Sequence, residues 1–126
     1  MAKTGVSMAL EEKISYQRVK HIVSSYQLDG TEADAFTSCL EELMDVYAPP
    51  IIELALAETL AAVWLRVPMP RGIEFLSCLD DRLQSWALDG ITRTLTPEEF
   101  HHITGLDPLP VFQSLDSPPP TILRRP

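Results

Sequence analysis

Residues 51–67, IIELALAETLAAVWLRV, decide the fold of this chain because they are apolar on nearly every side of a helix. The polar exceptions are Glu53, Glu58, Thr59 and Arg66. A helix that is apolar all round is buried by neighbours on several sides. In a chain of 126 residues, this predicts either the central helix of a bundle or a helix that a second subunit also covers.

Amphipathic helices are predicted before this segment. One helix face is indicated over about residues 8–27 by apolar side chains at helical spacing, namely Val19, Ile22, Val23 and Tyr26. Gly30 ends that helix and Thr31 is predicted to cap the next one. The second helix has an apolar seam of Phe36, Leu40, Leu43 and Tyr47, and the Pro49–Pro50 pair ends it.

Two further helices are predicted after the break at residues 67–72, which contains two prolines and a glycine. The first has a seam of Leu76, Leu79, Leu83 and Trp86. The second is short, because Thr96, Pro97 and Glu99 form a capping-box pattern and Gly105 provides a stop. Beyond Gly105 the frequent prolines predict an extended tail without regular helix.

The predicted fold class is therefore all-α: an irregular four-helix bundle, a short fifth helix and an extended Pro-rich C-terminal tail. The chain divides into a flexible N-terminus over 1–7, a single helical domain over 8–107 and the tail over 108–126. The predicted core consists of Val19, Ile22, Phe36, Leu40, Leu43, Leu54, Leu60, Trp64, Leu76, Leu79 and Leu83.

The charge balance excludes several classes of partner. Lys and Arg number 10 and Asp and Glu number 18, which gives a net charge of −8. A nucleic-acid binder or a protein that docks on anionic lipid needs a basic surface. The sequence has no secretory signal and no run that could span a membrane, so a cytoplasmic location is expected. There Cys39 and Cys78 are expected to be reduced, with a disulfide between them as the alternative.

No sequence motif for catalysis is present, and we expect no enzyme activity, catalytic residue, cofactor or metal site. The nearest approach to a metal site is Glu98 with His101 and His102, at helical ligand spacing. The two histidines are adjacent and diverge by about 100° around the helix, so they cannot bind one ion together. One carboxylate and one imidazole make half a site, and a solvated helix face is the simpler interpretation.

Glu53 and Glu58 are the unusual residues of the apolar helix. A carboxylate on such a helix must reach water, a basic partner or a hydrogen-bond donor. Either each faces the least covered edge of the helix, or one of them pairs with Arg66, Arg71 or Arg82.

The distribution of charge favours an interaction function. From His21 to Leu65 there is no Lys or Arg, and most of the acids in this stretch lie on or just before the second helix. That helix is predicted to steer a basic protein partner through an acidic face of Glu32, Asp34, Glu41, Glu42 and Asp45. The tail is predicted to dock through Ile122, Leu123, Arg124 and Arg125. We therefore expect a non-enzymatic adaptor or regulatory protein, forming a homodimer that covers part of the apolar helix.

An alternative function is a sensor of a small anionic ligand. Its pocket would lie between the third and fourth helices and be lined by Trp64, Arg66, Arg71 and Trp86. The two alternatives differ in the placement of Arg66 and Arg71, which should converge on a concave apolar pocket in a sensor and splay over a convex surface in an adaptor.

Two stretches carry a family resemblance. They run from Trp64 to Gly72 (WLRVPMPRG) and from Leu95 to Phe100 (LTPEEF), followed by ITGLDP at 103–108. Over roughly residues 45–110 the chain resembles small all-helical proteins of cyanobacteria that carry no assigned activity. The resemblance implies an accessory role in the cytoplasm of a photosynthetic cell, and it implies no functional residue.

Overall fold

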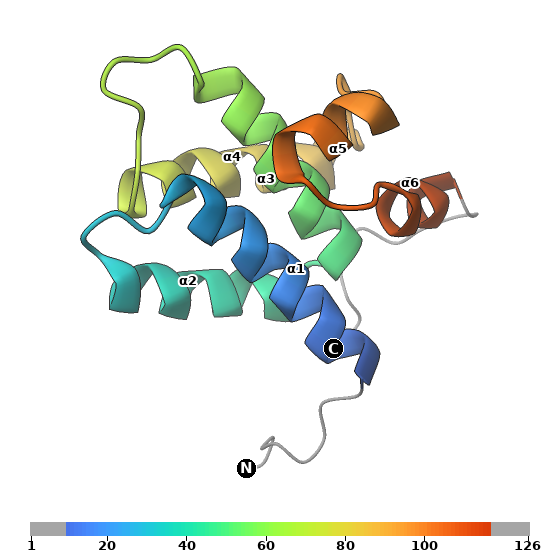
Figure 1. Cartoon of the computed structure of the whole chain (residues 1–126), viewed down its shortest axis with the longest axis horizontal. Helices are drawn as coiled ribbons and strands as arrows, with labels where there is room; N and C mark the ends of the chain where they lie inside the picture. The colour runs from blue at the N-terminus through green and yellow to red at the C-terminus, as the bar shows by residue number, and fades with distance from the viewer. Residues whose placement is uncertain (1–9, 117–126) are drawn as a thin grey trace.

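Six α-helices and no strand make up residues 10–116, the part of the chain that the structure, a computed structural model, describes (Figure 1). They are α1 (Leu10–Tyr26), α2 (Ala33–Val46), α3 (Pro49–Val63), α4 (Ile73–Asp89), α5 (Pro97–Thr104) and α6 (Leu109–Asp116). The predicted all-α class is confirmed. The expected flexible N-terminus over 1–7 and the tail beyond residue 116 lie outside the described residues. In the described range no helix has the length and apolarity to cross a membrane.

Helix α3 is the centre of the molecule. It contacts each of the other five helices, and every residue from Ile51 to Leu60 is buried. Figure 1 shows α1 running alongside α3, with α5 and α6 grouped on the opposite side of α3 from α2. Of the two sequence interpretations, the central helix is therefore correct. The chain itself covers α3, so the burial of this helix gives no reason to expect a second subunit.

The seams of α1, α2 and α4 face this centre. Val19, Ile22, Phe36, Leu40, Leu54, Leu60, Leu76, Leu79 and Leu83 are all buried, as predicted, and Leu43 is partly buried. The prediction for Trp64 is wrong, because its side chain is 55% exposed. Helix α3 ends at Val63, four residues earlier than expected, so Trp64 leaves the buried helix and begins the connection to α4.

The start of α2 also differs from the prediction. The N-cap residue is Glu32 rather than Thr31, and no side chain caps this helix. Residues 27–32 form consecutive turns, in which Gly30 N–H donates to the Gln27 carbonyl (3.0 Å) and Glu32 N–H to the Asp29 carbonyl (2.9 Å). These turns hold Thr31 away from the helix start.

The ends of α5 match the prediction closely. Thr96 accepts a hydrogen bond from the Glu99 N–H (3.1 Å), and the Glu99 carboxylate accepts one from the Thr96 N–H (2.9 Å). Pro97 occupies the first turn and Gly105 has the left-handed conformation that ends the helix. This reciprocal cap fixes the orientation of a helix of only eight residues.

Helix α6 corrects the prediction of an extended chain after Gly105. Pro110 is its second residue, where a backbone N–H has no partner within the helix, so proline costs nothing there. Asp107 Oδ1 accepts the Leu109 N–H (3.0 Å), and the Pro108 carbonyl accepts from Val111 (3.1 Å) and Phe112 (2.9 Å). Val111 and Phe112 are buried, which gives α6 the tertiary packing that stabilises a short helix.

The burial of Leu40 provides a test of the α2 register. This side chain is 1% exposed, so Leu40→Asp places a charge in the core and leaves a void. We expect the free energy of unfolding to fall by about 4 kcal/mol or more, enough to unfold a domain of ordinary stability. Ser38→Asp on the exposed side of the same helix is the matched control. Thermal unfolding followed by circular dichroism measures both, and an unchanged melting temperature for Leu40→Asp would refute the register.

Candidate functional site

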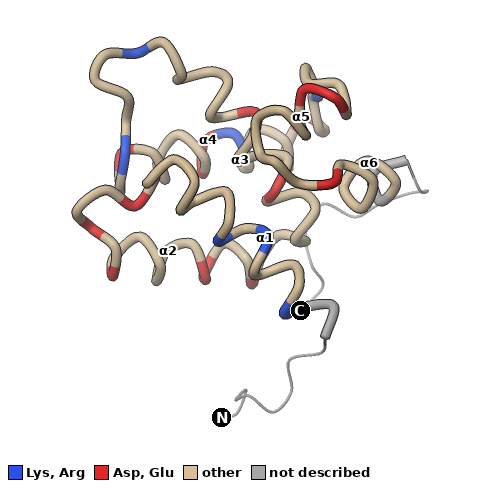
Figure 2. The backbone as a smooth tube through the Cα atoms, in the orientation of Figure 1, with Lys and Arg blue, Asp and Glu red and all other residues tan. Residues whose placement is uncertain are grey.

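The acidic residues of α2 lie on the side of the helix that faces away from the core. All five predicted residues, Glu32, Asp34, Glu41, Glu42 and Asp45, are exposed. Figure 2 shows acidic positions along α2 and no Lys or Arg on that helix. The buried side chains Phe36 and Leu40 lie on the opposite face and fix this orientation.

Two of the five residues bind elsewhere in the molecule. Glu32 Oε1 accepts the Ile73 N–H (3.0 Å) and so satisfies a free donor in the first turn of α4. Glu41 Oε2 accepts the Tyr16 hydroxyl of α1 (3.3 Å). Burial, followed by the charge and hydrogen bond of Glu41, raises the pKa of Tyr16. The remaining three, Asp34, Glu42 and Asp45, project from α2 within about 80° of one another around the helix, and we call them the acidic edge.

Glu53 is bound by an arginine that the sequence interpretation did not consider. Its Oε1 lies 2.8 Å from Arg18 Nη2 and 2.9 Å from Arg18 Nε, and the side chain is 3% exposed. Arg18 Nη2 also donates to the Asp107 carbonyl (2.8 Å), so one guanidinium joins α1, α3 and the α5–α6 connection. Burial raises the pKa of Glu53, and the hydrogen bond and charge of Arg18 lower it by less.

Glu58 is bound by backbone rather than by a cation. Its Oε2 accepts the N–H groups of Thr94 (2.7 Å) and Leu95 (3.0 Å), and its Oε1 accepts the Thr94 hydroxyl (2.6 Å). Arg82, one of its predicted partners, donates instead to Thr59 Oγ1 (3.0 Å). Both sequence interpretations of Glu53 and Glu58 are therefore wrong: the two carboxylates are buried, and neither pairs with Arg66, Arg71 or Arg82. The two carboxylates therefore have a structural role: Glu53 binds α3 to α1, and Glu58 binds α3 to the segment before α5.

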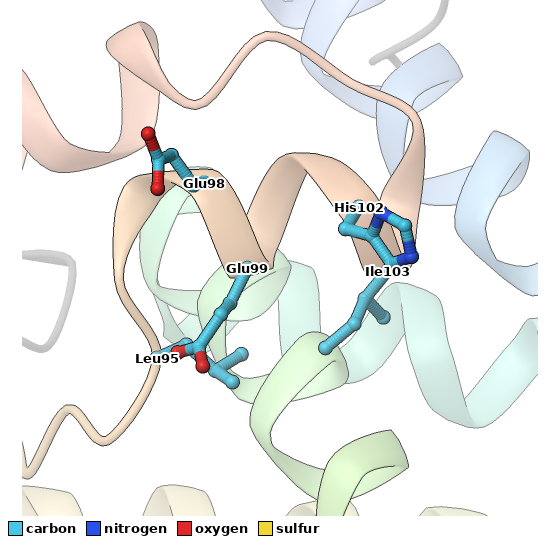
Figure 3. A pocket seen from close by; sticks show the side chains of 5 residues that line it. All are labelled: Leu95, Glu98, Glu99, His102 and Ile103. Atoms are coloured by element: carbon cyan, nitrogen blue, oxygen red, sulfur yellow. The ribbon is translucent and has the colours of Figure 1, made fainter.

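The histidines of α5 do not form a cluster with Glu98. Figure 3 shows the Glu98 and Glu99 carboxylates on different sides of the helix, with His102 near its other end. Leu95, Glu98, Glu99, His102 and Ile103 line a shallow cavity of about 350 Å³. His101 Nδ1 lies 3.0 Å from the Leu106 carbonyl. Glu99 is occupied by the helix cap, so this cavity presents no paired acid and base.

The predicted ligand pocket is not assembled as a unit. Trp86 is buried in the core and 3% exposed, whereas Trp64 and Arg71 line a cavity of about 290 Å³ with Ser25, Tyr26, Gln27 and Met69. Arg66 is exposed and does not line that cavity. Of the two arginines, only Arg71 lines this cavity, so the structure does not bring both of them to one pocket. The sequence gives no sign that Tyr26 and Met69 meet, because Tyr26 belongs to the apolar seam of α1 and Met69 lies more than 40 residues later in the α3–α4 connection.

The cysteines and the tail complete the set of predicted residues. Cys39 is exposed, Cys78 is half-buried and both are free thiols. Over residues 10–116 no group of three or more metal-ligating side chains occurs. The tail residues Ile122, Leu123, Arg124 and Arg125 lie outside the described part of the chain. The sequence does indicate that Arg18, the partner of Glu53, lies near the buried face of its helix. Arg18 precedes Ile22 of the apolar seam by one helical turn.

Comparison of the chain with protein-family models, with curated proteins and with solved structures finds no match. The resemblance to small helical cyanobacterial proteins therefore stays a prediction.

The raised pKa of Glu53 predicts the pH dependence of folding. Because the native state binds the Glu53 proton more tightly than the unfolded chain does, this residue stabilises the fold less as pH rises between the two pKa values. We therefore take the free energy of unfolding of the wild type minus that of Glu53→Gln. This difference should be more positive at about pH 4.5 than at about pH 7. Urea unfolding at both pH values measures it. A difference that grows with pH would show that the Arg18 ion pair, and not burial, dominates.

Proposed function

We propose that this chain is a non-catalytic protein-interaction module, an adaptor or regulatory protein that presents the acidic edge of α2 to a basic segment of a partner protein. The observation that carries the proposal is the exposure of Asp34, Glu42 and Asp45 on a helix that has no basic residue. The proposal extends to the tail residues 122–125 as a second docking element and to a cytoplasmic location. It also extends to the finer architecture, a four-helix bundle that forms a homodimer.

Rigid support makes the acidic edge suitable for recognition. Phe36 and Leu40 anchor α2 in the core, and Glu32 ties the start of α2 to the start of α4. The helix backbone that carries the three carboxylates is therefore already ordered, and only their side chains lose freedom at the moment of binding. Like charges on a single face raise the rate of encounter with a cationic partner, and added salt reduces that rate.

The sensor alternative has weaker support. Of its four residues only Trp64 and Arg71 share a cavity, and Trp86 is enclosed by the core. A ligand between α3 and α4 would have to displace packed side chains.

Association kinetics test the acidic edge. The probe is a nona-arginine peptide, and the variant is Asp34→Asn/Glu42→Gln/Asp45→Asn. A matched control, Glu74→Gln/Asp81→Asn/Asp89→Asn, removes the same charge from exposed positions of α4. At low salt we expect the association rate to fall several-fold for the acidic-edge variant and clearly less for the control, with the difference vanishing at about 1 M salt. Equal losses for the two variants would show that only the net charge matters and would contradict the proposal.

A further inference from the structure

The connection between α3 and α4, residues 64–72, exposes large apolar side chains. Leu65 is 87% exposed, Val67 94% and Trp64 55%, whereas the apolar side chains of the core are almost fully buried. Figure 1 shows this α3–α4 loop standing out from the helices at one corner of the molecule. Exposed apolar side chains that are adjacent in space mark interaction sites more often than single ones do.

The loop is held against α1 and the turns that follow it. Gly72 N–H donates to the Leu28 carbonyl (2.6 Å), and Arg71 Nε donates to the Tyr26 carbonyl (3.4 Å). The Trp64 and Tyr26 rings meet edge to face, with their centroids 5.6 Å apart. Gly72 has a φ of +65°, and a Cβ there would lie 2.1 Å from Glu32 Oε1, so the return of the loop to α4 requires glycine. The loop is thus anchored at its two ends, at Trp64 and at Arg71–Gly72, and Leu65 and Val67 project from the stretch between them.

Between the loop and α1 lies the cavity of about 290 Å³ that Tyr26, Trp64, Met69 and Arg71 line. Ser25 and Gln27 line the rest of the cavity, so its wall is both polar and apolar. The two aromatic rings and the thioether form the apolar part that an apolar side chain can contact, and Met adapts to groups of different shape. The volume is at the low end for ligand cavities, which fits one inserted side chain better than a cofactor. At the rim Arg71 supplies a guanidinium, which binds carboxylates in a fixed geometry.

The charge on the α3–α4 loop itself is the reverse of that on α2. Over residues 10–116, the one carboxylate shown to reach its end is Glu32, whose Oε1 accepts the Ile73 N–H (3.0 Å). Arg66 and Arg71 are exposed, and neither lies within ion-pair distance of a carboxylate in the part of the chain that the structure describes. No acidic residue occurs between residues 59 and 73. In a chain of 18 acidic and 10 basic residues, two arginines without an acidic partner beside an apolar loop favour an anionic occupant from outside the chain.

We propose that the α3–α4 loop and its cavity bind an acidic peptide segment of a partner protein. One large apolar side chain of the peptide occupies the cavity against Tyr26 and Trp64, and its carboxylates pair with Arg66 and Arg71. Leu65 and Val67 contact the rest of the peptide. This surface is separate from the acidic edge and has the opposite charge preference, so the module would hold two partners of opposite charge.

Charge also decides against the other occupants. An anionic membrane is repelled by the net charge of −8, and a second copy docked on this loop would bring its own charge of −8 against it. The homodimer proposed above would therefore use another surface. An acidic segment on a flexible stretch of a partner meets the two arginines without bringing a whole acidic surface into contact.

Panning of a phage-displayed random dodecapeptide library on the immobilised full chain tests this proposal. We expect the enriched peptides to combine Asp or Glu with one Trp, Phe or Leu. A synthetic peptide of the enriched sequence should lose about tenfold or more in affinity on Arg71→Glu and on Leu65→Ser. Leu65 is too exposed for its replacement to disturb folding. Lys20→Glu, an equal change of charge on α1, and the acidic-edge variant should keep wild-type affinity.

Several results would overturn the proposal. These are the absence of any enriched peptide, enrichment of basic peptides, or equal binding by the loop variants and by Lys20→Glu. Sedimentation velocity of the wild type and of Leu65→Ser measures self-association. If the wild type self-associates and Leu65→Ser does not, a second copy of the chain is the occupant of the loop and the proposal is wrong. The nona-arginine experiment tests only the acidic edge, and the peptide experiment tests only the α3–α4 loop. Either proposal can therefore be contradicted without the other.

Discussion

The structure depends on the burial of α3 on all sides, along ten consecutive residues from Ile51 to Leu60. A helix in that position cannot carry a polar group without a partner, because an unpaired carboxylate in the core costs several kcal/mol. Glu53 and Glu58 nevertheless lie there. Arg18 binds the first, and the backbone of Thr94 and Leu95 binds the second. The two carboxylates thereby determine where α1 and the extended segment before α5 must run.

The polar side chains around α3 are occupied by contacts within the molecule. The polar side chains of the centre are used to fasten α3 to its neighbours, and the Arg18 guanidinium is shared between Glu53 and the Asp107 carbonyl. The two binding surfaces that we propose lie at the periphery, on the acidic edge of α2 and on the apolar, arginine-bearing α3–α4 loop. The two surfaces have opposite charge and are supported by the same core, which fits a module that connects partners.

Local signals in the sequence were sufficient for five of the helices and insufficient for the sixth. Periodic seams and the Thr96 cap identify α1 to α5 because those signals are contained in a few neighbouring residues. Helix α6 depends on the burial of Val111 and Phe112, the latter against Phe100 of α5, and this long-range packing is not visible in the local sequence. The partners of Glu53 and Glu58 depend on how distant segments cross α3. The prediction that Trp64 is buried fails because α3 ends at Val63, one residue before it.

The acidic edge could be predicted because charge and periodicity coincide there, whereas the cavity beside Tyr26 arises from residues far apart in sequence.

Native-state hydrogen exchange measured by NMR tests the role of the buried carboxylates most directly. Thr94 and Leu95 lie in a segment without helix or strand, so their amides would exchange fast unless Glu58 binds them. The account predicts slow exchange at these two amides in the wild type, fast exchange at the neighbouring Thr92, and loss of the protection in Glu58→Ala while the amides of α3 stay protected. Exchange at Thr94 and Leu95 as fast as at Thr92 in the wild-type chain would contradict it.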